Sequence, residues 1–537
     1  MPAEPHDGAG ASGTGAPDVT LIGRLVNELY RGHAVEDAPP PPGDAVPLAA
    51  PGPGAQAFAG EAFDTGLTDA APGRLLGGVR GLPLAAEALQ GLLPPQPGRS
   101  MVHGSHTGVP APRLYFLPHE APADAGPARV PAFDVQAVRR EFPALNQSVH
   151  GRPLVWLDNA ATTQKPRHVI DTVSRFYERD NSNVHRTAHA LAARATEAYE
   201  AARRTVQRYL GARGPEEIVF VRGTTEGINL VAQTFGRANI GRGDEIVVTE
   251  LEHHANIVPW QMLAQETGAV LRVVPITDAG EVRLDAYEQL LARRPCLVAL
   301  SHASNVLGTI LPVELMTRMA HAHGARVLID GAQSVPHFRV DVQAIGCDFY
   351  VFSGHKLFAP TGIGVLYGTG DLLRAMPPWQ GGGNMIESVS FEGTTYADIP
   401  HKFEAGTGIL AGAVGLGAAI DYLDRLGFDA LSRHEHALLD HGTRALGTVD
   451  GLRIIGTAPH KVAVLSFVVD GARPEDVAAH LDRAGIAVRA GHHCAQPTMR
   501  RFSVTGTVRA SLAFYNTRAD VDALVATLRE MPRRRHG

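Results

Sequence analysis

The sequence predicts an α/β protein with a large, mostly parallel sheet from about residue 131 onward, and two observations support this fold class. Near-continuous apolar runs of strand length alternate with segments of helical pattern, which is typical of parallel strands covered by helices on both faces. Several runs also end in polar residues, and ligands of such sheets bind at the carboxyl ends of the strands. The strand-like runs are residues 217–223, 244–252, 297–304, 325–333 and 349–356.

The segments between and after these runs complete the expected architecture. Helical patterns cover residues 224–236 and a stretch that begins near Ile257. After about residue 420 a smaller α/β unit is expected, with strands at 461–470 and 508–515 and a closing helix from Ala519. We therefore predict a large domain over 131–420 and a small domain over 421–537, with residues 131–150 able to pack on the small domain.

Residues 1–130 differ from the rest of the chain, because they are rich in Ala, Gly and Pro and hold no lysine or cysteine. Such a composition cannot bury enough apolar surface to offset the entropy of ordering, so we predict a disordered extension. Three apolar islands interrupt it, at residues 18–32, 73–93 and 111–118. Each island can dock on its own domain or fold into a partner's groove, and three separate islands favour the partner.

Composition excludes several classes of protein. The net charge of -6 gives no basic footprint for nucleic acid. No apolar run approaches the roughly 18 residues that cross a bilayer, and the N-terminus lacks the pattern of a secretory signal. The chain has 3 cysteines, too few for a disulfide scaffold, which indicates a reducing compartment and hence the cytoplasm.

Lysine chemistry has few candidates, because only four of the 49 basic residues are lysines: Lys165, Lys356, Lys402 and Lys461. A lone lysine is usually a surface charge. Lys356 is different, because it follows an apolar strand in "FYVFSGHKLFAPTG", with Ser353 and His355 beside it. A lysine at a strand end can form a Schiff base with a carbonyl cofactor.

The context of Lys356 fits a pyridine-ring cofactor that carries a phosphate. Asp330 ends a strand three residues before Gln333, and a buried carboxylate there would keep a pyridine nitrogen protonated. Thr224 and Thr225 begin a helix, where free N–H groups favour a phosphate. His253 ends another strand and can stack on a ring. Each of these residues taken alone has a structural alternative, such as a helix cap or a turn. The whole set in this order is more specific for the cofactor than any one residue.

From about residue 131 to the end, the chain resembles a cysteine desulfurase of the SufS-like group, which has the class V aminotransferase fold. The matching stretches, in order, are "LDNAATTQKP", "NSNVHRTAH", "RGTTEGINLV", "ELEHHANIVPW", "LIDGAQSVPH", "SGHKLFAPTGIGVLYG" and "GHHCAQP…VRASLAFYNT". The resemblance implies the fold type I of transferases that use pyridoxal 5'-phosphate (PLP). It also implies a homodimer with active sites at the subunit interface, and no metal site.

The same resemblance implies a role for each motif residue. Lys356 is the Schiff-base lysine, Asp330 pairs with the pyridine nitrogen, Gln333 with the ring oxygen O3′, and His253 stacks on the ring. The phosphate residues are Thr224, Thr225, Ser353 and His355, with Thr407 reaching the phosphate of the partner subunit. The residues for the substrate and the catalytic loop are Arg509, Asn305, His185, Arg489 and His493. Relatives commonly have proline after the threonine of "EAGT", and here the next residue is Gly408, a departure that concerns the shape of the loop and not Thr407.

Cys494 is the expected nucleophile. It lies in the polar loop "RAGHHCAQP", where imidazoles and the cofactor lysine favour thiolate. Cys296 and Cys347 lie at the heads of apolar strands and are expected to be buried structural thiols. The expected reaction converts L-cysteine to alanine, with Lys356 removing the Cα proton and Cys494 keeping the sulfur as a persulfide. A sulfur-acceptor protein is an expected partner.

The extension also carries a resemblance. "TLIGRLVNELYRG" and "RLYFLP", within the Pro/Gly/Ala-rich tail, look like the targeting extension of desulfurases packaged in family 2A encapsulin shells. This implies an encapsulated cargo enzyme, bound to the shell protein through residues 1–130, with a role in sulfur storage. Two alternatives stay open: a selenocysteine lyase of the same fold, and a non-catalytic cargo or scaffold protein.

Overall fold

A seven-stranded sheet forms the centre of the computed structural model, which describes residues 133–184 and 189–531. The strand order is β4-β10-β9-β8-β7-β5-β6, and only β10 runs against its neighbours. The bounds are β4 (Ile218–Val221), β5 (Glu245–Thr249), β6 (Val270–Val274), β7 (Leu297–Ser301), β8 (Arg326–Asp330), β9 (Phe349–Ser353) and β10 (Gly364–Gly368). The predicted α/β class with a mostly parallel sheet is confirmed. The expected disorder of residues 1–130 falls on a segment outside the described residues.

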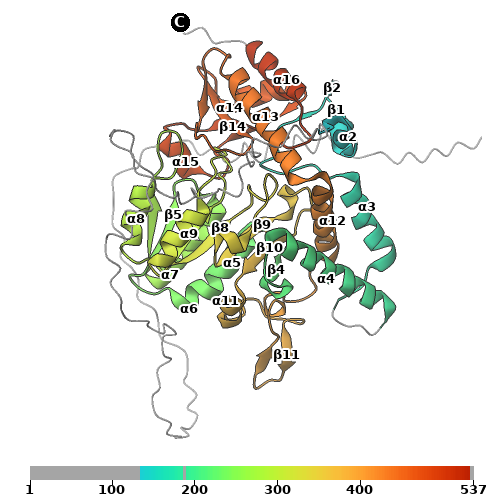
Figure 1. The fold of residues 1–537 in the computed structure, drawn as a ribbon, viewed down its shortest axis with the longest axis vertical. Helices are drawn as coiled ribbons and strands as arrows, with labels where there is room; N and C mark the ends of the chain where they lie inside the picture. Colours follow the sequence, from blue (N-terminus) through green and yellow to red (C-terminus); the bar gives the residue numbers. More distant parts are fainter. Residues whose placement is uncertain (1–132, 185–188, 532–537) are drawn as a thin grey trace, which may run out of the picture. The chain divides into compact units, whose positions relative to one another are not determined.

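Both faces of this sheet are covered by helices (Figure 1). In β8, Val327 and Ile329 belong to one apolar core and Leu328 to the other, because successive side chains of a strand point to opposite faces. The first core includes α4 (Ala190–Leu210), α8 (Leu284–Leu291), α9 (Val313–Ala322) and α12 (Leu410–Leu426). The second includes α5 (Thr224–Val231), α7 (Val258–Thr267) and α11 (Gly370–Ala375). Burial on both faces explains why the central strands β7 and β9 are almost entirely apolar.

A second, antiparallel sheet lies near the C-terminal end of the chain, in the order β13 (Leu452–Ile455), β14 (Val464–Val469), β17 (Thr507–Ser511) and β16 (Arg489–Gly491). Leu465 and Phe467 of β14 share a core with α13 (Phe428–Leu446), α14 (Pro474–Arg483) and α16 (Arg518–Arg529). Ser466 faces the other way, and its Oγ donates to the carbonyl of Val306 at 2.6 Å. One face of this sheet therefore lies against the loop that follows β7.

The segment that begins at Val155 runs beside this second sheet. Its short strand β3 (Val155–Trp156) pairs in parallel with β15 (Ile486–Ala487), and Asp158 forms a bridge with Ser511. Earlier in the chain, Arg139 of α2 (Val135–Arg140) contacts Asp520 at 3.0 Å. The predicted domain division near residue 420 stays a prediction. Within the described ranges, no helix is long and apolar enough to span a bilayer.

Candidate active site

A cavity of about 460 Å³ lies where the strands of the large sheet end. It is lined by residues that follow β4, β5, β7, β8 and β9, together with the loop around Cys494 and two arginines of the second sheet. The predicted site residues in its wall are Thr224, Thr225, His253, Asn305, Asp330, Gln333, Ser353, His355, Lys356, Arg489, His493, Cys494 and Arg509. The structure thus brings these residues together, and their individual roles stay predictions.

Two predicted residues are not in this wall. Thr407 is exposed and lines a separate pocket of about 500 Å³ together with Trp379 and Glu404. Its Oγ1 donates to Asn183 Oδ1 at 3.3 Å. The prediction gives Thr407 to the cavity of a partner subunit, so a single chain does not test it. His185 lies outside the described residues.

Lys356 and Asp330 form the polar centre of the cavity. Lys356 ends the turn η7 (Gly354–Lys356) directly after β9, and burial lowers its pKa to about 8 while Asp330 opposes that shift. Burial raises the pKa of Asp330, against the hydrogen bond that its Oδ1 accepts from Ala332 N at 2.9 Å and against the charge of Lys356. Gly331 follows, where any Cβ would meet the ring of Tyr350 at 2.1 Å.

The peptide unit just before Lys356 is held by the "TTQK" segment. The carbonyl oxygen of His355 accepts from Lys165 Nζ at 3.0 Å, from Thr163 N at 3.1 Å and from Thr162 Oγ1 at 3.1 Å. Lys165 is therefore half-buried and hydrogen-bonded, and burial lowers its pKa to about 8. Sequence reasoning missed this contact. The available signal was the position of Lys165 within the stretch "LDNAATTQKP".

The N-terminus of α5 lies beside the end of β9. Ser353 Oγ accepts from Thr224 N at 2.9 Å and lies 2.8 Å from Thr224 Oγ1. Burial, with the charge of Lys356, lowers the pKa of His355 to about 4, so this imidazole is neutral at pH 7. Unpaired N–H groups and hydroxyls at a helix start suit a phosphate.

His253 follows a buried carboxylate, Glu252, that sequence reasoning missed. Burial lowers the pKa of His253 to about 3, and its Nδ1 accepts from Ala255 N at 3.0 Å, so Nε2 carries the proton of the neutral ring. The preceding Glu252 is fully buried and accepts from Ser301 N at 3.0 Å, Ser301 Oγ at 2.6 Å, and Thr249 Oγ1 and Asn256 Nδ2 at 2.7 Å each. Burial raises the pKa of Glu252 to about 7.

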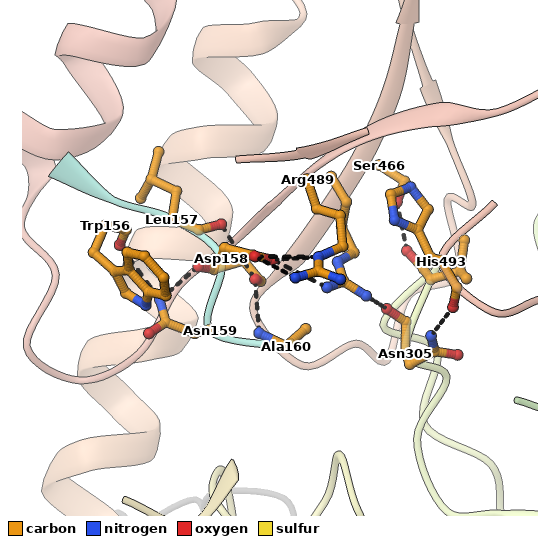
Figure 2. A network of polar contacts seen from close by, with 12 residues as sticks. Trp156, Leu157, Asp158, Asn159, Ala160, Asn305, Ser466, Arg489 and His493 are labelled. Carbon is orange, nitrogen blue, oxygen red and sulfur yellow. Dashed lines mark hydrogen bonds and ion pairs between the residues drawn. The ribbon is translucent and has the colours of Figure 1, made fainter. Parts of the chain in front are cut away.

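Asp158 joins the two arginines of the cavity, as Figure 2 shows for Arg489. Arg489 Nη2 lies 3.0 Å from Asp158 Oδ2, and Arg509 Nη2 lies 3.2 Å from Asp158 Oδ1. Arg509 also donates from Nη1 to the carbonyl of Asn305 at 2.8 Å, and burial outweighs Asp158 in lowering its pKa to about 10. The sequence prediction included both arginines and omitted Asp158.

The loop around Cys494 is fixed at both of its central peptides. His493 and Cys494 adopt left-handed backbone angles, with φ of 54° and 56°. Asn305 Nδ2 donates to the carbonyl of His493 at 2.7 Å, and His254 N donates to the carbonyl of Cys494 at 2.7 Å. Cys494 itself is exposed. An exposed thiol is thus presented on a loop whose backbone is held in place.

The other two cysteines lie outside the cavity wall. Cys347 is 1% exposed, as expected for a structural thiol, and burial strongly raises its pKa. The expectation for Cys296 is wrong in part, because this residue is only half-buried. The reason is its position just before β7, where it contacts the core from the edge.

Some buried polar atoms of the cavity wall make no hydrogen bond to the described parts of the chain. Four buried atoms of its residues have no hydrogen-bond partner among the described parts of the chain: Asn305 Oδ1, Gln333 Oε1, His493 Nδ1 and Arg509 Nε. A buried polar atom without a partner is costly, so such atoms favour a polar ligand. A phosphorylated pyridine fits the polar groups of this cavity, with Asp330 to accept from a ring nitrogen and the start of α5 to donate to the phosphate.

Comparison with known proteins agrees with this geometry. The aminotransferase class-V family matches residues 155–524. A cysteine desulfurase of Synechococcus elongatus is 60% identical over 399 residues, which cover 74% of this chain and 64% of that protein. A probable cysteine desulfurase of Mycolicibacterium paratuberculosis is 50% identical over 509 residues, which cover 92% of this chain and 74% of that protein. The crystal structure of the Escherichia coli cysteine desulfurase CsdA is 43% identical, with a TM-score of 0.69, over 74% of this chain and 98% of that chain.

The chain therefore belongs to the aminotransferase class-V family. Its relatives within that family, at 50–60% identity, are named cysteine desulfurases. The aminotransferase class-V family depends on pyridoxal phosphate, which is accordingly the cofactor of this chain. The chain spans only 64% of the length of the Synechococcus relative.

Proposed function

We propose that the protein is a cysteine desulfurase, which takes sulfur from L-cysteine, leaves L-alanine and keeps the sulfur on Cys494 as a persulfide. One observation carries the proposal: a single cavity is lined by Lys356, Asp330, Arg509 and an exposed cysteine. An aminotransferase of the same family has no use for that thiol. The similarity to desulfurases over the described residues supports the same activity.

The residues of the cavity suit each part of the cofactor. Asp330 would hold the pyridine nitrogen, His253 would lie against the ring and Gln333 would contact O3′. The phosphate would bind at Thr224, Thr225, Ser353 and His355, with Thr407 supplied by a second subunit and His185 near the substrate. When bound to Lys356, pyridoxal phosphate supplies an electron sink for the substrate's Cα.

The chain's own residues perform the remaining tasks. Arg509 and Asn305 orient the α-carboxylate of L-cysteine, since a guanidinium binds a carboxylate through paired hydrogen bonds. Lys356 Nζ, with a pKa of about 8, can take the Cα proton and return it at physiological pH. Cys494 Sγ attacks the substrate sulfur, so an S–S bond forms as the Cβ–S bond breaks, and protonation of Cβ completes L-alanine.

The test compares the wild type with three variants. Cys494→Ala should keep the visible absorbance of the bound cofactor and lose sulfide release from L-cysteine in the presence of a thiol reductant. Lys356→Ala should lose both. Cys296→Ala is the matched control, because it removes a partly accessible thiol outside the cavity, and it should behave as wild type. Undiminished sulfide release by Cys494→Ala would contradict the proposal.

We further propose that the active form is a homodimer of the SufS-like group, and that a protein acceptor removes the persulfide. Two hydrogen bonds hold the backbone of the Cys494 loop in place. Because the loop is held, we expect an acceptor protein to come to the Cys494 thiol. Sedimentation of the holoenzyme tests the dimer. Persulfide turnover with and without a candidate acceptor tests the partner, and equal rates would exclude the need for one.

The third proposal concerns residues 1–130, which we assign to binding an encapsulin shell, with the enzyme held inside that compartment in the cytoplasm. The alignment with the Mycolicibacterium relative supports a shared extension, because 509 residues exceed the stretch from 133 to the end. Co-expression with a family 2A shell protein tests the assignment. The full chain should co-purify with shells, and a chain lacking residues 1–130 should not. Equal co-purification would reject it.

A further inference from the structure

A buried tyrosine hydroxyl joins three neighbouring strands of the large sheet just outside the cavity wall. Tyr350 lies in β9, and its Oη lies 2.9 Å from Nδ1 of His302, which follows β7, and 2.7 Å from Oγ of Ser334, which lies in the turn after β8. All three residues are fully buried, and none of them lines the cavity. Any influence of this group on a bound ligand must therefore pass through neighbouring residues.

The direction of each hydrogen bond in this group follows from the protons available. Ser334 Oγ donates its one proton to the Gly331 carbonyl at 2.9 Å, so it must accept from the Tyr350 hydroxyl. The Tyr350 oxygen then accepts from His302 Nδ1. Burial lowers the pKa of His302 to about 3, so its ring is neutral at pH 7 and carries its single proton on Nδ1. A chain of hydrogen bonds thus runs from His302 through Tyr350 and Ser334 to the Gly331 carbonyl.

The chain of hydrogen bonds ends on the turn that carries two predicted contacts of the cofactor ring. Asp330 and Gln333 flank the middle of this turn, and both line the cavity. Ala332 N donates to Asp330 Oδ1 at 2.9 Å, so the position of the carboxylate depends on the backbone of the turn. A Cβ on Gly331 would lie 2.1 Å from the Tyr350 ring, so this ring packs directly against the same backbone. The ring and the hydroxyl of Tyr350 therefore both hold the turn in place.

We propose that Tyr350 is a positioning residue, which holds the turn after β8 so that the Asp330 carboxylate stays at the pyridine nitrogen of the cofactor. The inference rests on the ring contact that the proposed function gives to Asp330, and it extends that contact to a residue outside the cavity. A carboxylate at the pyridine nitrogen keeps the ring positively charged. A positive ring lowers the pKa of the nitrogen through which Lys356 holds the cofactor, because one positive charge disfavours a second one nearby.

The test follows the visible absorbance of the holoenzyme as a function of pH. Tyr350→Phe keeps the ring but removes the donor to Ser334, so the turn is held less firmly and the midpoint of the titration should rise by about 0.5 pH units or more. Tyr287→Phe is the matched control, because Tyr287 is also fully buried and donates to the Met316 carbonyl at 2.9 Å outside the cavity wall. Each variant loses one buried hydrogen bond and should lose similar stability, but Tyr287→Phe should keep the wild-type midpoint. An unchanged midpoint in Tyr350→Phe, or an equal shift in Tyr287→Phe, would overturn the proposal.

A second variant breaks the same contact from the side of the turn. Ser334→Ala removes the acceptor of the Tyr350 hydroxyl and should raise the midpoint as Tyr350→Phe does. In the double variant the two shifts should not add, because both changes break one contact. A wild-type midpoint in Ser334→Ala counts against the proposal even where Tyr350→Phe does not fold. A holoenzyme that shows the expected shifts but releases no sulfide from L-cysteine would refute the proposed function alone.

Discussion

The backbone N–H of His254 donates a 2.7 Å hydrogen bond to the carbonyl oxygen of Cys494. A second contact runs the opposite way, since Gln496 N donates to His254 Nε2 at 3.1 Å. The turn after β5, which carries His253, is thereby tied to the loop that carries the thiol. His253, the proposed ring-stacking residue, and Cys494, the proposed nucleophile, thus lie on two segments that are hydrogen-bonded to each other.

His254→Ala removes the acceptor for Gln496 N and should slow sulfide release by about two- to tenfold, the worth of one hydrogen bond. The visible absorbance of the bound cofactor should stay as in wild type, because His254 is not in the cavity wall. Steady-state sulfide assays measure the effect. His436→Ala, an exposed histidine of α13, is the control, and equal loss in both variants would contradict the role of the loop contact.

Lys165→Met should weaken retention of the cofactor about two- to twentyfold, because it removes one donor from the His355 carbonyl next to Lys356. Dialysis followed by absorbance measures the bound fraction. Lys461→Met is a matched control, since Lys461 is half-buried like Lys165, has a pKa lowered to about 8 by burial, and donates to the Gly456 carbonyl at 2.6 Å. Similar cofactor loss in both would show that the effect is global.

Glu252 makes stability depend on pH. Burial raises the pKa of this carboxyl from 4.5 to about 7 in the folded chain, so between these values the folded state binds more protons than the unfolded state. Stability from this group is complete below pH 4.5 and falls as the pH rises to about 7, by about 3 kcal/mol. Glu252→Gln lacks this fall. Urea unfolding of both proteins from pH 5 to pH 8 measures it, and parallel curves would refute the assignment.

Arg203→Met should lower the free energy of unfolding by about 3–5 kcal/mol, because it leaves a buried carboxylate without its cation. Arg203 is 1% exposed and contacts Glu404 at 2.7 Å, while its guanidinium lies 4.6 Å from the ring centre of Phe220. Urea unfolding measures the loss. The neighbouring Arg204 forms an exposed pair with Glu197, so Arg204→Met should change stability by less than about 1 kcal/mol.

Sequence patterns predict the sheet and most of the cavity wall for one physical reason. Apolar runs mark strands that are buried on both faces, and the polar residues that follow them must lie at the same edge. Asp330, Ser353 and Lys356 were found in this way. Their distances from one another are set by the sheet itself, so local patterns suffice.

The residues that sequence reasoning missed have partners far away along the chain. Asp158 contacts Arg489 and Arg509 across 331 and 351 residues, and Lys165 contacts the His355 carbonyl across 190. Contacts between residues so far apart leave no periodic pattern in the sequence. Glu252 was missed for another reason: a glutamate at the end of a strand normally reaches solvent, and only the packed structure shows the four donors that enclose it.

The wall of the cavity is made of segments that leave the ribosome in a fixed order. Asp158, the start of α5, Asp330 and Lys356 are synthesised first, and Cys494 and Arg509 follow more than 130 residues after Lys356. Because chains fold from the N-terminal side during synthesis, the large sheet can form before the Cys494 thiol exists. Cys494 and Arg509, the proposed nucleophile and the proposed substrate residue, are thus added last to a pocket whose other segments already exist.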